Sequence, residues 1–92
     1  MKYRLGLRKI TEGDMNRDCL LLPEPEDYEM YVTAMTEDIN QLEIVEYALM
    51  DNSSIVIKLV VGFNIEHLKQ ATTSIQQKYW DVLRTTRFEN IA

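Results

Sequence analysis

The chain has 92 residues, 46% of them hydrophobic and 27% charged, which is the size and composition of one folded domain rather than of a disordered segment. Its net charge of −5 and pI of 4.8 argue against direct binding to nucleic acid, because modules that contact phosphates are basic. No apolar run long enough to span a membrane, no secretory signal and no second cysteine beside Cys19 are present, so we expect a cytoplasmic protein without membrane contact.

The first part of the chain predicts one strand and indicates a second. Apolar and polar residues alternate from Tyr3 to Arg8, which is the period of two expected for a half-buried strand over residues 3–10. A turn follows. The apolar residues 19–22, stopped by Pro23, then indicate a second short strand or an extended segment.

A helix is predicted over residues 25–40. Pro25 suits the first helical position, and Glu26 and Asp27 then fall in the first turn, where the helix dipole favours carboxylates. Apolar residues recur at helical spacing and form one face, which consists of Tyr28, Val32, Met35 and Ile39.

Residues 43–50 allow two interpretations. Leu42 and Leu49 would extend the apolar face of the first helix, whereas the alternation of apolar and polar residues indicates a strand. The turn-forming residues 51–54 and the β-branched run at 55–62 favour a hairpin, because this is the simpler geometry for a strand–turn–strand pattern. We therefore prefer the strand for residues 43–50.

The C-terminal part predicts a second helix over residues 65–85, with Asn64 as its cap. The following residues 86–92 form a tail that either frays or is docked by Phe88 and Ile91. Two helices covering one face of a small antiparallel sheet make an α+β two-layer domain, and we expect residues 1–92 to form one such domain. Its strands are expected near 3–10, 43–50 and 55–62, with 19–22 as a further candidate.

No group of side chains in the sequence indicates catalysis, a cofactor or a metal site. His67 is the only histidine, and the neighbouring Glu66 would point to a different side of the helix, so we expect both on the surface. Asp18 next to Cys19 disfavours a reactive thiolate. We therefore expect a protein that is not an enzyme and that holds no cofactor and no metal ion.

The charge is unevenly distributed along the chain. Residues 18–57 carry ten carboxylates and no lysine or arginine, while the segments before and after them carry net charges of +3 and +2. A rigid helix and an adjoining strand would present many of these carboxylates to a basic partner. The residues expected to contact this partner are Glu26, Asp27, Glu29, Glu37, Asp38, Glu43 and Glu46.

In charge and size alone, the chain resembles the small acidic DNA-mimic inhibitors that phages use against restriction enzymes or nucleoid proteins. The first hypothesis is therefore a non-enzymatic inhibitor or regulator that occupies the DNA-binding surface of another protein. A homodimer formed through Met30, Ile44 and Tyr47 would lengthen the charged track. The alternative is a structural or adaptor subunit of a homo- or hetero-oligomer, which binds through Met30, Tyr31 and Ile44 while a solvated acidic face keeps it soluble.

Overall fold

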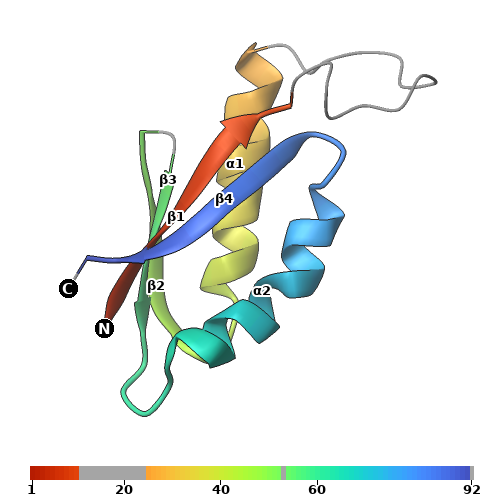
Figure 1. The fold of residues 1–92 in the computed structure, drawn as a ribbon. Helices are drawn as coiled ribbons and strands as arrows, with labels where there is room; N and C mark the ends of the chain where they lie inside the picture. Colours follow the sequence, from red (N-terminus) through yellow and green to blue (C-terminus); the bar gives the residue numbers. More distant parts are fainter. Residues whose placement is uncertain (11–24, 53, 92) are drawn as a thin grey trace.

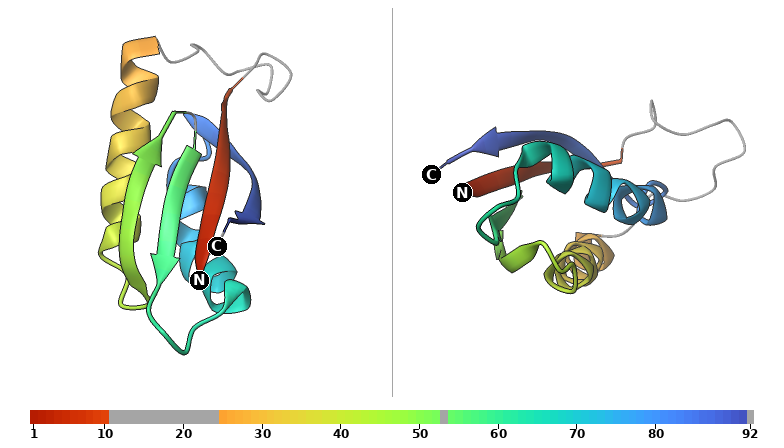
Figure 2. Two further views of the ribbon diagram at one scale, coloured as in Figure 1. Left: turned by 90° about the vertical axis from the view of Figure 1, so that its left-hand side faces the viewer. Right: turned by 90° about the horizontal axis from the view of Figure 1, so that it is seen from below.

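The computed structural model describes residues 1–10, 25–52 and 54–91. In chain order the elements are β1 (Lys2–Lys9), α1 (Pro25–Asn40), β2 (Val45–Asp51), β3 (Ser54–Leu59), α2 (Ile65–Lys78) and β4 (Leu83–Asn90). The strands form one antiparallel sheet in the order β2-β3-β1-β4, and both helices cover the same face of it (Figures 1 and 2). This connectivity is that of the split βαβ, or ferredoxin-like, arrangement, and the predicted α+β two-layer class is confirmed.

Strand β1 lies inside the sheet and shows the predicted alternation. Tyr3, Leu5 and Leu7 are buried beneath the helices, whereas Arg4 and Arg8 lie on the opposite surface of the sheet, which we call the open face. Each such burial contributes roughly 1.5–3 kcal/mol, so the alternation fixes which surface of the strand faces the helices.

A β-bulge interrupts the pairing of β1 with β4 at Gly6. Two residues of β4, Thr86 and Arg87, lie opposite this single glycine, and a Cβ atom at Gly6 would meet the Thr86 hydroxyl. The glycine therefore allows the two strands to approach closely at the bulge.

The core between sheet and helices uses the predicted helical spacing. In α1, Val32, Met35 and Ile39 are buried, and α1 begins at Pro25 as predicted. In α2, Leu68 and Ile75 are buried in the same way. Both helices are thus held by one apolar stripe against one layer of sheet residues.

Residues 45–51 form strand β2 rather than a continuation of α1, so the hairpin interpretation is confirmed, with residues 43 and 44 in the turn before the strand. Strand β2 pairs with β3, and the turn between them places Asn52 at a φ of 56°, a left-handed conformation that asparagine tolerates better than most residues. Asp51 and Ser54 close the hairpin as the last paired residues.

The side chain of Asn40 covers the outer edge of β2. Its Nδ2 donates to the carbonyl oxygen of Ala48 at 2.8 Å, and its Oδ1 accepts from the Ala48 N–H at 2.6 Å. The amide thus takes the place that a neighbouring strand would have at this point of the edge.

The chain after Lys78 differs from the prediction. Helix α2 ends at Lys78 instead of continuing to residue 85, and residues 83–90 form β4 instead of a fraying tail. Tyr79 and Leu83 match helical spacing, but a turn lies between them. Leu83 is instead a buried residue of β4, which pairs with the side of β1 that β3 leaves free. No glycine or proline marks that turn. The predicted short strand at 19–22 lies outside the described residues.

Neither helix in the described part of the chain has the length and apolar character needed to cross a membrane.

Candidate partner-binding surface on helix α1

Helix α1 presents an outward stripe of residues three and four positions apart, opposite its buried face. The stripe consists of Asp27, Met30 and Glu37, with the partly buried Ala34 between the last two. Asp27 and Glu37 are exposed at its two ends and are separated along the helix by about 15 Å, given ten residues at 1.5 Å each. Between them the Met30 side chain is 56% exposed, so the stripe has an apolar centre and acidic ends.

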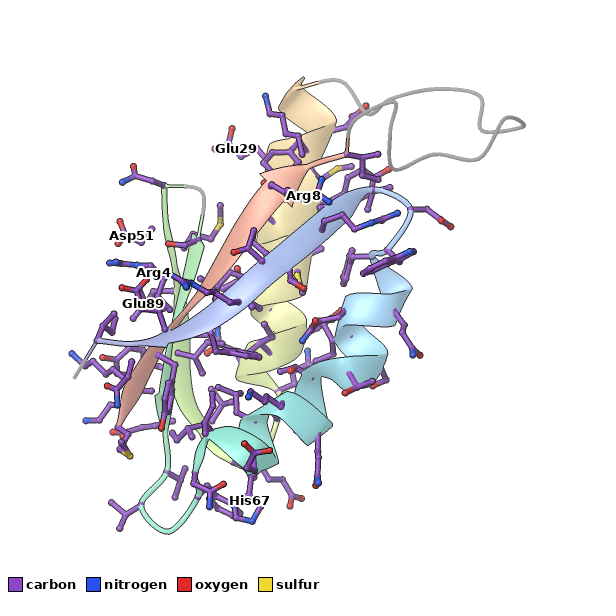
Figure 3. All side chains as sticks on the ribbon, viewed as in Figure 1. Arg4, Arg8, Glu29, Asp51, His67 and Glu89 are labelled. Carbon is purple, nitrogen blue, oxygen red and sulfur yellow. The ribbon has the colours of Figure 1, made fainter. Side chains whose placement is uncertain are left out.

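Glu29 lies on a different flank of α1 from Asp27. It is exposed and points toward the β2–β3 hairpin side of the helix (Figure 3). One turn later on that flank the Thr33 hydroxyl contacts the Met50 sulfur at 3.2 Å. The predicted acidic residues of α1 therefore spread around its solvent side rather than along one line.

Asp38 is partly buried and is bonded within the chain. Its Oδ2 accepts hydrogen bonds from the Tyr79 hydroxyl at 2.7 Å and from Lys78 Nζ at 2.9 Å, which connects α1 to the end of α2. These hydrogen bonds, from Tyr79 first and then Lys78, lower the pKa of Asp38 below its ordinary value of 3.8. The negative charge of Asp38 is thus largely matched within the chain.

Glu46 is also engaged, in an ion pair with Lys58 Nζ at 3.4 Å across the β2–β3 pairing. Glu43 is exposed in the connection between α1 and β2. Glu26 lies in the first turn of α1, with its side chain outside the described residues. Four of the seven predicted residues are therefore exposed and form no ion pair within the described part of the chain. We call them the α1 acidic surface, and they are Asp27, Glu29, Glu37 and Glu43.

The open face of the sheet carries basic side chains, as the alternation along β1 predicts for Arg4 and Arg8. Lys2, Arg4 and Arg8 alternate along β1 on this face, and Lys58 joins them from β3. The period of two in residues 3–10 predicts the grouping on β1, and the expected cover of one face of the sheet by two helices leaves this face open. On the open face, Arg4 and Lys58 are thus paired with Asp51 and Glu46, whereas the exposed carboxylates of α1 have no described cationic partner.

An open hollow of about 370 Å³ lies at the hairpin end of the open face. Arg4 on its rim forms an ion pair with Asp51 at 3.2 Å, and Figure 3 shows the two side chains together. The Ser54 hydroxyl in its lining donates to the Asp51 carbonyl at 2.8 Å. Arg4 and Ser54 in the lining of the hollow are therefore both bonded to Asp51.

His67 has a structural function at the start of α2. Its Nδ1 accepts from the Asn64 N–H at 3.1 Å, and the Asn64 side chain accepts from the N–H groups of Glu66 and His67. This is the reciprocal arrangement of a capping box, with histidine in the position usually held by glutamate. The expected exposure of Glu66 and His67 is confirmed, and so is Asn64 as the cap.

Metal-binding side chains are dispersed in the described residues, where no three of His, Cys, Asp and Glu lie close enough to hold an ion. Cys19 lies outside those residues. No protein-family model, no curated protein and no solved structure matches this chain.

Proposed function

We propose that this chain is a non-enzymatic binding protein that uses the α1 acidic surface to occupy a basic surface of another protein. One observation carries the proposal: the four carboxylates of this surface are exposed and unmatched by any described cation, on a segment without lysine or arginine. Such a field attracts a positively charged partner over several ångströms and raises the association rate.

The apolar centre of the α1 stripe supports a contact beyond long-range attraction. Met30 is flanked by Asp27 and Glu37, so an apolar side chain would be surrounded by charged groups in the complex. Protein interfaces commonly have this arrangement, in which a central apolar contact is enclosed by a polar rim.

The partner surface in this proposal is one that binds DNA, so that the protein acts as an inhibitor or regulator. DNA-binding surfaces carry dense lysine and arginine because a duplex presents one negative charge per roughly 1.7 Å of its axis. A rigid helix that holds carboxylates over about 15 Å offers such a surface an alternative ligand. We place this activity in the cytoplasm, which the single cysteine supports.

Two double variants with equal charge change test the proposal. Glu29→Gln with Glu37→Gln alters the α1 acidic surface, whereas Glu66→Gln with Asp81→Asn removes two exposed carboxylates elsewhere. Both change the net charge from −5 to −3, because two of the negative charges are removed. Proteins captured from lysate on the immobilised chain and eluted by rising salt would supply the partner for calorimetry.

We expect the α1 variant to weaken the partner's affinity about tenfold, from roughly 0.2–1 kcal/mol per exposed charge pair, and the control variant to leave it nearly unchanged. Affinity should fall as salt is raised, and duplex DNA should compete for the partner. Equal affinities of the two variants, or an affinity indifferent to salt, would overturn the proposal. Binding that survives the charge changes but is lost in Met30→Ser would instead identify an adaptor subunit.

A further inference from the structure

The two edges of the sheet differ in how they are protected. On the outer edge of β2, both the N–H and the C=O of Ala48 are bonded to the Asn40 side chain. On the outer edge of β4, no strand pairs within the described part of the chain, although β4 is eight residues long. A strand edge that no described strand covers is a template for another strand.

The hydrogen-bond pattern shows which backbone groups of β4 point outward. The Ile91 N–H donates to the Lys2 carbonyl oxygen at 3.1 Å, so the backbone of Ile91 faces β1. By the alternation of an antiparallel ladder, Glu89 also faces β1, where it pairs with Arg4. The N–H and C=O of Phe88 therefore point away from β1, toward the outer edge.

The residues on either side of Phe88 carry opposite charges, so this segment is electrostatically complementary to an antiparallel copy of itself. Arg87 and Glu89 flank it, both are exposed, and neither forms an ion pair with a described residue. Both side chains lie on the open face, because Phe88 between them packs toward the helices. An antiparallel copy of β4 centred on Phe88 would place each Arg87 directly opposite Glu89 of the other copy, in two equivalent pairs.

We propose that two copies of this chain associate through their β4 edges, antiparallel about a twofold axis at Phe88, to form one continuous eight-stranded sheet. The two Phe88 residues would exchange N–H···O bonds, and their half-buried rings would pack on the helix side. The pairing spans residues 87–89 of each copy, beside the bulge at Thr86 and Arg87. The inference is independent of the proposed function, because it uses no residue of the α1 acidic surface.

Charge reversal across the axis provides the test. In Arg87→Glu the facing side chains would all be acidic, and in Glu89→Arg they would all be basic. We expect each single variant to raise the dimer dissociation constant at least about tenfold, measured by light scattering and sedimentation over a concentration series. The double variant, Arg87→Glu with Glu89→Arg, should return to within about threefold of the unaltered chain. Lys69→Glu, an equal charge change on α2, should have no effect.

Mixing the two single variants gives the sharpest outcome. The acidic and basic variants are each expected to remain monomeric alone and to form a heterodimer when combined, because every facing pair is then opposite in charge. An unaltered chain that stays monomeric at all concentrations would overturn the proposal. So would a dimer that both single variants leave intact, or a mixture that does not pair. Circular dichroism of each variant confirms that the fold is retained.

Discussion

Asp38 links the two helices through a single carboxylate oxygen shared by Lys78 and Tyr79. Because these hydrogen bonds lower the pKa of Asp38 in the folded state, the unfolded chain binds more protons as the solution is acidified. The hydrogen bonds of Asp38 therefore stabilise the folded state at pH values above the ordinary pKa of 3.8. This stabilisation is lost as the pH falls through the lower pKa of the folded state.

We expect Asp38→Asn to lower the free energy of unfolding by about 1 kcal/mol at pH 7, since the carboxylate is partly exposed, and by less at pH 3. Urea unfolding at both pH values measures the difference. Asp81→Asn, which alters an exposed carboxylate without an ion pair in the described residues, serves as the control. An equal loss of stability at both pH values would contradict the assignment.

Asn64 supplies the oxygen that satisfies two N–H groups at the start of α2. Asn64→Ala should lower the free energy of unfolding by about 1 kcal/mol, whereas Asn64→Asp should retain most of it, because aspartate accepts the same hydrogen bonds. For a domain of this size, 1 kcal/mol corresponds to about 4–8 °C in the melting temperature. Equal melting temperatures of the two variants would show that the side-chain oxygen contributes nothing.

At the scale of elements, the edge of β2 depends on one residue of α1. Removing the amide in Asn40→Ala leaves Ala48 with only water as a partner, so we expect a loss of about 1 kcal/mol in the free energy of unfolding. Gln41→Ala, at the adjacent exposed position, should change it by less than about 0.5 kcal/mol. Urea unfolding compares the two variants, and an equal effect would refute the role of Asn40.

The sequence was most informative where local pattern and burial agree. The strand at residues 3–10, the helix beginning at Pro25 and the cap at Asn64 were all predicted, because each depends on neighbouring residues only. Strand β4 was not, because Tyr79 and Leu83 also satisfy helical spacing. Residues 83–90 form a strand because they pair with β1, and β1 comes from the opposite end of the chain.

The candidate site shows the same limit. The exposure of Glu29 and Glu37 could be predicted from helical spacing alone. The internal bonding of Asp38 could not, because Lys78 and Tyr79 lie forty or more positions away in the sequence. The ion pair of Glu46 likewise follows from the register of the hairpin, which the sequence does not determine uniquely.

For the whole molecule, the arrangement of layers separates the two surfaces to which we assign contacts. Helix α1 packs beside β2, at the edge of the sheet opposite β4 (Figure 2). In a dimer joined at β4, both helical layers would lie on one side and the two α1 helices at its outer ends. Each copy would then keep its own α1 acidic surface free, and a partner with two basic sites would bind by avidity.

The amide of Asn40 also determines how far such an assembly can grow. Pairing of β4 with β4 is closed, because a twofold axis uses both open edges at once. Pairing of β4 with β2 would be head-to-tail and would repeat from copy to copy into a fibre. Because Asn40 occupies the N–H and C=O of Ala48, the β2 edge is blocked at this point, and we expect the sheet to extend through β4 alone and to stop after one addition.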